Sequence, residues 1–256
     1  MNANPVKAKL ARGERVFGTM LFEFATPGIA AIVAAAGAEF LLYDMEHSGL
    51  GIETIKQQIA CCRGLDLVPI VRVQGPQYHF IAPVMDAGAK GIMVPMVESA
   101  ETAQAIVAAT RYPTAGVRGA AFNIAHDDYR PGAVADKVAA ANAQTIVIAM
   151  IETARGMENV EAIAAVPGVD LLWLGHFDLT NSLGIPGEFQ HPRFLAAVDR
   201  LVAAAKAAGK PLGIMASSVA NGREVLGRGF SAIAYSGDIW LLQEALANGL
   251  AQLRAR

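Results

Sequence analysis

Two acidic residues stand at comparable positions in the second half of the chain. Glu152 follows an apolar run over residues 146–150, and Asp178 follows a second run over residues 171–174. A helical pattern lies between them and continues to about residue 165. Two parallel strands joined by a helix form a right-handed unit, so both strands end at the same edge of the sheet. This spacing predicts two neighbouring carboxylates, which could bind a divalent cation or act as an acid/base pair. The alternative is that each acid caps the helix that follows it.

An arginine and a histidine extend this chemistry. Arg72 ends another apolar run, and its planar guanidinium suits a carboxylate or an enolate oxygen. The alternative for Arg72 is a salt bridge to Asp44 or Glu46. His47 also follows an apolar run, and an imidazole can act as a general base near neutral pH. Together with two acids, these residues favour a catalytic site over an exposed polar surface.

Lysine placement restricts the mechanism. None of the seven lysines follows an apolar run, where a Schiff-base lysine of a barrel enzyme would have to stand. Carbonyl chemistry would therefore need a metal ion as Lewis acid. The histidines show no pair with the i, i+4 spacing of a helical zinc site. The only two cysteines, Cys61 and Cys62, are adjacent, which argues against a disulfide and indicates a reduced, cytoplasmic protein.

A repeating unit of apolar strand, polar loop and amphipathic helix would position these residues. The strands are predicted over residues 16–21, 40–43, 68–71, 92–94, 146–150, 171–174, 212–215 and 232–235. Helices are predicted over residues 27–36, 52–63, 78–87, 100–111, 133–143, 219–228 and 239–254, with two more ending near residues 165 and 208. Near-continuous apolar strands alternating with helices predict an α/β fold, a closed (β/α)8 barrel of the TIM type. An open doubly wound sheet is the alternative, but the stretch at residues 49–51 lacks the third glycine of a phosphate loop.

Composition agrees with a single barrel domain over residues 1–256. The chain is 54% hydrophobic and 17% charged, which allows a large core. A formal net charge of −2 argues against nucleic acid or an anionic membrane surface as a partner. No apolar run approaches the roughly 18 residues of a membrane span, and the first residues lack a signal-peptide core.

In such a barrel the active site lies at the C-terminal ends of the strands. Glu23, Ser217 and Asp238 follow the first, seventh and eighth predicted strands, which makes them candidates for a substrate pocket. A long polar segment at residues 112–131 interrupts the repeat. Long ordered loops in compact domains are usually functional, so we expect this segment to be a lid or an interface arm.

Seven short blocks, in order, resemble the HpcH/HpaI family of class II pyruvate aldolases. They are LLYDMEH at 41–47, PIVRV at 69–73, VPMVE at 94–98, RYP at 111–113, RG at 118–119, IET at 151–153 and GHFDL at 175–179. The resemblance spans roughly residues 18–242. The family includes 2,4-dihydroxyhept-2-ene-1,7-dioate and 2-keto-3-deoxy sugar-acid aldolases and is related to citrate lyase β subunits.

The resemblance implies a role for several residues. Glu152 and Asp178 would bind a divalent metal, Mg²⁺ or Mn²⁺ first, with Co²⁺ or Zn²⁺ as alternatives. Arg72 would contact the pyruvate part. The catalytic base would be His47, oriented together with nearby waters by Asp44 and Asp86. The family also implies a last helix exchanged between subunits, usually in a hexamer that is a trimer of dimers.

The reaction implied is cleavage of a 4-hydroxy-2-oxoacid to pyruvate and an aldehyde, and the reverse addition, through a pyruvate enolate that the metal stabilises. Other enzymes on the same barrel would be a 2-oxoacid decarboxylase or a citryl- or malyl-type lyase. A thioester substrate would require a basic groove, for which the 112–131 segment offers only Arg118 and Arg130. Outside catalysis, the alternative is a barrel that only binds carboxylates.

The chain departs from the family pattern near the acceptor. Met150 stands where the family commonly has glutamine, and His176-Phe177 stand where it has proline and a small residue. His126 replaces a frequent arginine in the 112–131 segment, and Phe122 could add to an apolar wall. These changes predict short or apolar aldehydes in preference to acidic semialdehydes.

Overall fold

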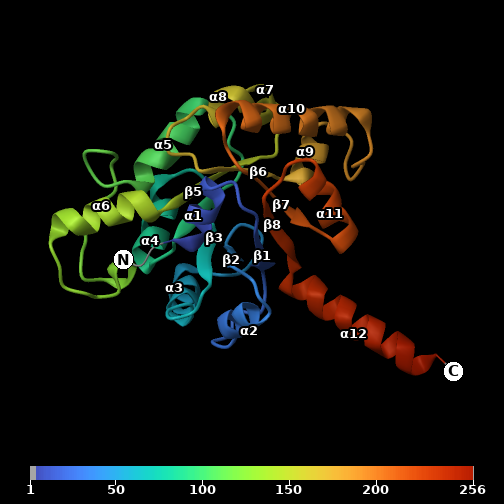
Figure 1. Cartoon of the computed structure of the whole chain (residues 1–256), viewed down its shortest axis with the longest axis horizontal. Helices are drawn as coiled ribbons and strands as arrows, with labels where there is room; N and C mark the ends of the chain where they lie inside the picture. Colours follow the sequence, from blue (N-terminus) through green and yellow to red (C-terminus); the bar gives the residue numbers. More distant parts are fainter. Residues whose placement is uncertain (1–3, 256) are drawn as a thin grey trace.

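The computed structural model describes residues 4–255, whose eight parallel strands close into a barrel (Figure 1). Each strand pairs with the next in the chain, and β8 pairs with β1. The strands are β1 (Val16–Leu21), β2 (Phe40–Asp44), β3 (Val68–Arg72), β4 (Gly91–Val94), β5 (Ile146–Ile151), β6 (Leu171–Leu174), β7 (Leu212–Ala216) and β8 (Ala232–Gly237). The predicted barrel is confirmed, and Arg72 ends β3 as the sequence indicated.

Strand side chains alternate between two cores. Phe40 and Leu42 belong to a cluster inside the barrel, whereas Leu41 and Tyr43 of the same strand belong to the cluster between barrel and helices. The two-residue period of a strand produces this division. Inside the barrel the indole of Trp173 lies over Gly213, where an added Cβ would overlap the ring.

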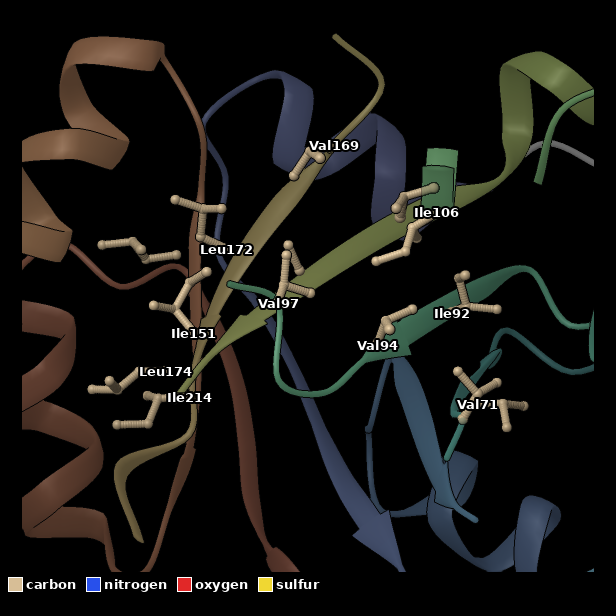
Figure 2. Packing of buried hydrophobic residues seen from close by; sticks show 14 of the residues in the cluster. Val71, Ile92, Val94, Val97, Ile106, Ile151, Val169, Leu172, Leu174 and Ile214 are labelled. Carbon is tan, nitrogen blue, oxygen red and sulfur yellow. The ribbon is translucent and has the colours of Figure 1, made fainter. Parts of the chain in front are cut away.

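The outer core packs the barrel against its helices. Figure 2 shows side chains from β3 to β7, including Val71, Val94 and Leu174, pointing away from the barrel axis towards this layer. Ile106 of the helix α5 packs in the same cluster. Strands β2 to β6 are buried at every position, which explains why they read as almost unbroken apolar runs.

The helices agree with prediction in number and place except near the chain start and after β5 and β6. They are α1 (Pro5–Ala11), α2 (Ile29–Ala35), α3 (Ile52–Cys61), α4 (Tyr78–Ala87), α5 (Ala100–Thr110), α6 (Val134–Gln144), α7 (Ala154–Glu158), α8 (Val160–Ala164), α9 (His176–Ser182), α10 (Pro192–Ala208), α11 (Val219–Gly227) and α12 (Asp238–Arg254), with a 3₁₀ turn η1 (Ala125–Asp127). The helix predicted to end near residue 165 is divided at Asn159. Two short helices, α1 and α9, were not predicted.

Helix α1 closes the amino end of the barrel. The side chain of Asn4 accepts a hydrogen bond from the Lys7 backbone N–H at 3.1 Å, and Pro5 occupies the first turn. Both residue types suit a helix start. Val6 and Leu10 are buried in the cluster inside the barrel, so α1 covers one end and leaves the other for the site.

The segment over residues 112–131 does not cover the C-terminal ends of the strands in this chain. Ala125 lines a cavity with Gly88 and Lys90, which precede β4, and with Leu67, which precedes β3. The segment therefore packs at the amino end of the barrel. The expectation of a lid is corrected for the single chain, and the interface arm stays a prediction.

Helix α12 leaves the body of the molecule instead of folding back onto the barrel (Figure 1). Only Asp238, at its start, is buried. Large apolar side chains along it are exposed, with Leu246 58% and Leu253 84% accessible. This geometry is the one that an exchanged helix requires, although exchange itself stays a prediction. Within residues 4–255, no helix combines the length and apolarity that crossing a membrane requires.

Candidate active site

A cavity of about 380 Å³ opens at the C-terminal ends of the strands, and we call it the mouth cavity. Its polar lining comes from Glu23 after β1, His47 after β2, Arg72 on β3, and His176 and Asp178 on α9. The barrel thus brings together residues that are up to 155 positions apart in the sequence, between Glu23 and Asp178. This gathering agrees with the usual place of the active site in such a barrel, and the site itself stays a prediction.

Arg72 is already paired with carboxylates. Its Nε and Nη2 donate to the two oxygens of Asp44 at 2.6 and 2.7 Å, which is a bidentate fork. Its Nη1 lies 3.2 Å from Glu46 Oε2 as an ion pair and 3.9 Å from the Met150 sulfur. The salt bridge considered as the alternative is therefore present, while the same guanidinium also lines the mouth cavity. Nη1 is the nitrogen with the weakest protein partners.

Asp44 fixes the backbone of His47 instead of its imidazole. The backbone N–H groups of Glu46 and His47 donate to Asp44, each at 3.1 Å, and the Ser48 hydroxyl donates to the Asp44 carbonyl. The His47 ring is exposed at the cavity rim, with Nε2 3.6 Å from Glu46 Oε2. Asp44 therefore positions both Arg72 and the turn that carries His47.

Glu152 directly follows β5, and its carboxylate has one satisfied and one unsatisfied oxygen. The Met96 backbone N–H donates to Oε1 at 2.7 Å, whereas Oε2 is buried without a hydrogen-bond partner. Burial raises the pKa of Glu152 to about 7, and the carboxylates of Glu46 and Asp178 act in the same direction. Gly175 leaves room for this side chain, because a Cβ there would lie 2.6 Å from Glu152 Cβ.

Asp178 stands in the first turn of α9, on the wall of the mouth cavity. A divalent cation beside Glu152 Oε2 would satisfy this buried oxygen and offset the repulsion between Glu152, Asp178 and Glu46, so the residues present fit a cation. Within residues 4–255 no three His, Cys, Asp or Glu side chains form a group that could hold a metal. The protein would thus supply two carboxylates, leaving the other positions to water and substrate, as Mg²⁺ prefers.

The rest of the mouth cavity is apolar. Phe22, Trp173, Met215 and Trp240 line it, together with the predicted Met150, His176 and Phe177. Burial lowers the pKa of His176 to about 4, so its imidazole is neutral at physiological pH. The cavity therefore combines charged groups from the loop after β1, from β3 and from α9 with apolar side chains from β1, β5, β6, β7 and α12.

Outside the lining of the mouth cavity lie four predicted site residues, Asp86, Phe122, His126 and Ser217. Asp86 pairs with Arg118 at 2.6 Å, and Phe122 and His126 pack with Tyr112 around Arg118, at the amino end of the barrel. In this chain none of the three lines the mouth cavity, so their predicted roles gain no support from it. Ser217 is exposed on a neighbouring cavity.

Asp238 is a structural anchor and not a wall of the mouth cavity. Its carboxylate accepts hydrogen bonds from the backbone N–H groups of Phe22, Glu23, Phe24 and Ile239, at 2.7 to 3.0 Å. It therefore ties the loop after β1 to the start of α12. Sequence reasoning did not assign Glu46, Trp173 or Trp240 to the site. From the sequence, Glu46 is only a possible salt-bridge partner of Arg72, and nothing distinguishes the two tryptophans from core residues.

Comparison with known proteins agrees with this geometry. A family model described as HpcH/HpaI aldolase/citrate lyase matches residues 19–245. Over 98% of each chain, the sequence is 38% identical to hydroxypyruvate/pyruvate aldolase from Paraburkholderia phytofirmans. It is 39% identical to 4-hydroxy-2-oxovalerate aldolase from Novosphingobium aromaticivorans, over 99% of this chain and 95% of that one.

A solved structure gives the same result. The crystal structure of an HpcH/HpaI aldolase/citrate lyase family protein from Burkholderia cenocepacia J2315 superposes with a TM-score of 0.93 and 34% identity, covering 99% of this chain and 100% of that one. The resemblance of the seven blocks is thereby confirmed over nearly the whole sequence. The protein belongs to the HpcH/HpaI aldolase/citrate lyase family.

Proposed function

We propose that this protein is a divalent-cation-dependent aldolase that cleaves 4-hydroxy-2-oxoacids to pyruvate and an aldehyde and catalyses the reverse addition. The observation that carries this proposal is the pair Glu152 and Asp178, whose carboxylates repel each other, with a buried unsatisfied oxygen on Glu152. Arg72 and His47 line the same mouth cavity as Asp178. Membership of an aldolase family and relatives named as aldolases of pyruvate and 4-hydroxy-2-oxovalerate support it.

Glu152 and Asp178 are the residues that would hold the cation, with Mg²⁺ or Mn²⁺ favoured by their hard oxygen ligands. A cation bound there supplies Lewis acidity that stabilises the enolate of a 2-oxoacid. Arg72 offers Nη1 to the substrate carboxylate or enolate oxygen, while its fork on Asp44 keeps the guanidinium in place. His47, exposed at the rim, removes the proton of the 4-hydroxyl during cleavage and returns it during addition.

A thioester lyase is less well supported by this chain. Arg118, one of the two arginines considered for phosphate contacts, is 2% exposed and is paired with Asp86. Its position at the amino end of the barrel leaves it away from the mouth cavity. The proposed substrates are therefore small: a 2-oxoacid and an aldehyde, without nucleic acid or membrane as partner. A cytoplasmic location is proposed as well, because both cysteines are free thiols.

The test is aldol addition of pyruvate to acetaldehyde with Mg²⁺ or Mn²⁺, followed by mass spectrometry of the product. Exhaustive chelation should abolish turnover, and either cation should restore it. Glu152→Gln and Asp178→Asn should each lower turnover by at least about 10³-fold, the scale of losing a preorganised electrostatic stabiliser. Full turnover in chelator, or in either variant, would contradict the proposal.

A further inference from the structure

A second cavity of about 240 Å³ lies next to the mouth cavity, between helices α10 and α11. Leu174, His176 and Phe177 line both cavities, so these residues form the wall between them. The rest of the lining includes the apolar Ile214 on β7 and Val225 on α11. Polar side chains of Gln190, Ser217 and Asn221 also line this cavity. Figure 2 shows Leu174 and Ile214 next to each other on the outer side of the barrel.

The wall between the cavities is aromatic and partly free to move. The Phe177 ring packs against Phe189 at 5.2 Å and against His176 at 4.6 Å between ring centroids. Phe177 is nevertheless 55% exposed. An exposed side chain changes rotamer on the nanosecond scale or faster, so little holds this ring in one position. Rotation of Phe177 away from the wall would join the two cavities.

Charges around both cavities argue for an uncharged occupant. Arg72 is paired with Asp44 and Glu46, as described above. On the rim of the second cavity, Arg228 is paired with Asp199 at 2.7 Å, and Glu224 adds a negative charge. Among residues 4–255 no unpaired cation lines either cavity, so a distal carboxylate on a substrate would find no partner there.

The volume of the mouth cavity also indicates that a long acceptor would occupy both cavities. The mouth cavity alone is at the small end of ligand pockets, which usually measure about 300–1,000 Å³. Pyruvate and the carbonyl end of an acceptor would occupy the mouth cavity near Arg72 and Asp178. A longer acceptor must then extend past Phe177, and the second cavity is the apolar space on the other side.

We propose that the cavity between α10 and α11 is an acceptor annex, which takes the uncharged apolar tail of the aldehyde, with Phe177 as the gate between the two cavities. This inference rests on the proposed aldol function and specifies its acceptor class. Phe177 and the residues that line the annex then determine which length of aldehyde tail the enzyme accepts. Apolar pockets discriminate by about 10- to 200-fold per group, so selection is graded.

The experiment compares acetaldehyde, hexanal and succinic semialdehyde as acceptors for pyruvate. Ser217→Trp places a ring into the annex from its exposed rim, and Val225→Phe fills it from α11. Each should lower the hexanal-to-acetaldehyde ratio of kcat/KM by about 10-fold or more. Val219→Trp is the matched control, because Val219 is exposed on α11 and lines neither cavity. Its ratio should equal that of the wild type.

Exchange of the pyruvate methyl protons with solvent, followed by NMR in the presence of Mn²⁺ or Mg²⁺, separates the two proposals. Absence of exchange in the wild type would refute the aldolase function. Exchange together with an unchanged acceptor ratio in both filled variants would refute the annex alone. A wild-type preference for succinic semialdehyde would refute it as well. The annex would also be refuted if Ser217→Trp and Val225→Phe changed the oligomeric state but left the hexanal-to-acetaldehyde ratio of kcat/KM unchanged. The cavity would then be a contact between copies of the chain.

Discussion

Arg72 is oriented by protein carboxylates before any substrate binds. Its fork on Asp44 is buried, with Asp44 fully inaccessible and Arg72 5% exposed. We predict that Arg72→Lys lowers kcat/KM for pyruvate addition by about 10- to 100-fold, because an ammonium cannot reproduce the planar fork. The free energy of unfolding should fall by about 1–3 kcal/mol, since Asp44 loses a charged partner.

The matched control for this substitution is Arg200→Lys. Arg200 makes a fork of the same kind on Glu161, with both contacts at 2.9 Å, but that pair is exposed. Exposed pairs contribute about 0–1 kcal/mol, so kinetics and denaturant melts of this variant should match the wild type. Equal effects of the two substitutions would show that burial of the Arg72 fork is irrelevant.

A substitution of Gly175 tests whether the proposed cation site requires the present position of the Glu152 side chain. A methyl group there would lie 2.7 Å from the Met150 methyl and would overlap the Glu152 side chain. We predict that Gly175→Ala weakens Mn²⁺ binding by at least about 10-fold, which corresponds to about 1.4 kcal/mol. Isothermal titration with Mn²⁺ provides the measurement. Gly227→Ala, where an added Cβ meets nothing within 4 Å, should bind Mn²⁺ as the wild type does.

At the scale of elements, β7 and β6 fit together through Gly213 and Trp173. A Cβ on Gly213 would meet the indole at 2.6 Å from Cζ3. We predict that Gly213→Ala lowers the free energy of unfolding by about 1–3 kcal/mol, the usual cost of overpacking. Urea melts measure the loss. In the Trp173→Phe background the same change should cost less, and an additive double-mutant cycle would contradict the stated contact.

The elements that sequence reasoning predicts correctly are those with a strong local signal. Strands β2 to β6 are apolar runs because every residue in them is buried, and Arg72 and Glu152 follow directly from the strand ends. Helix α9 was missed because its seven residues, HFDLTNS, show little apolar periodicity. Asp178 is accordingly placed on a helical first turn instead of a loop.

Contacts between segments that are distant in the sequence explain the remaining differences between the predicted and the observed structure. Whether Arg72 pairs with Asp44 depends on the register of β2 and β3, which places these two residues opposite each other. The direction of the 112–131 segment is set by packing of Ala125 beside Gly88 and Lys90, which its polar composition does not encode. The role of Asp238 likewise arises from three backbone N–H groups more than 200 residues away.

At the scale of the whole molecule, α12 exposes large apolar side chains along its length. Its exposed leucines are an apolar surface that a second copy of the chain would cover, and we propose that the protein is an oligomer, a hexamer by family resemblance. We predict that Leu246→Lys combined with Leu250→Lys lowers the molar mass measured by light scattering. Gln243→Lys with Gln252→Lys, exposed polar positions on the same helix, should leave the mass unchanged. A monomeric wild type would contradict the prediction.

The hydrogen bonds of Asp238 connect α12 to the pocket. One carboxylate holds both the loop that carries Glu23 and the first turn of α12, whose Ile239 and Trp240 line the mouth cavity. If a second copy of the chain holds α12 in place, the fraction of molecules with a fully formed pocket depends on the protein concentration. Specific activity would then fall on dilution, as chains separate and the loop relaxes. The amount of protein in the cell would set not only how many sites exist but how well each one is formed.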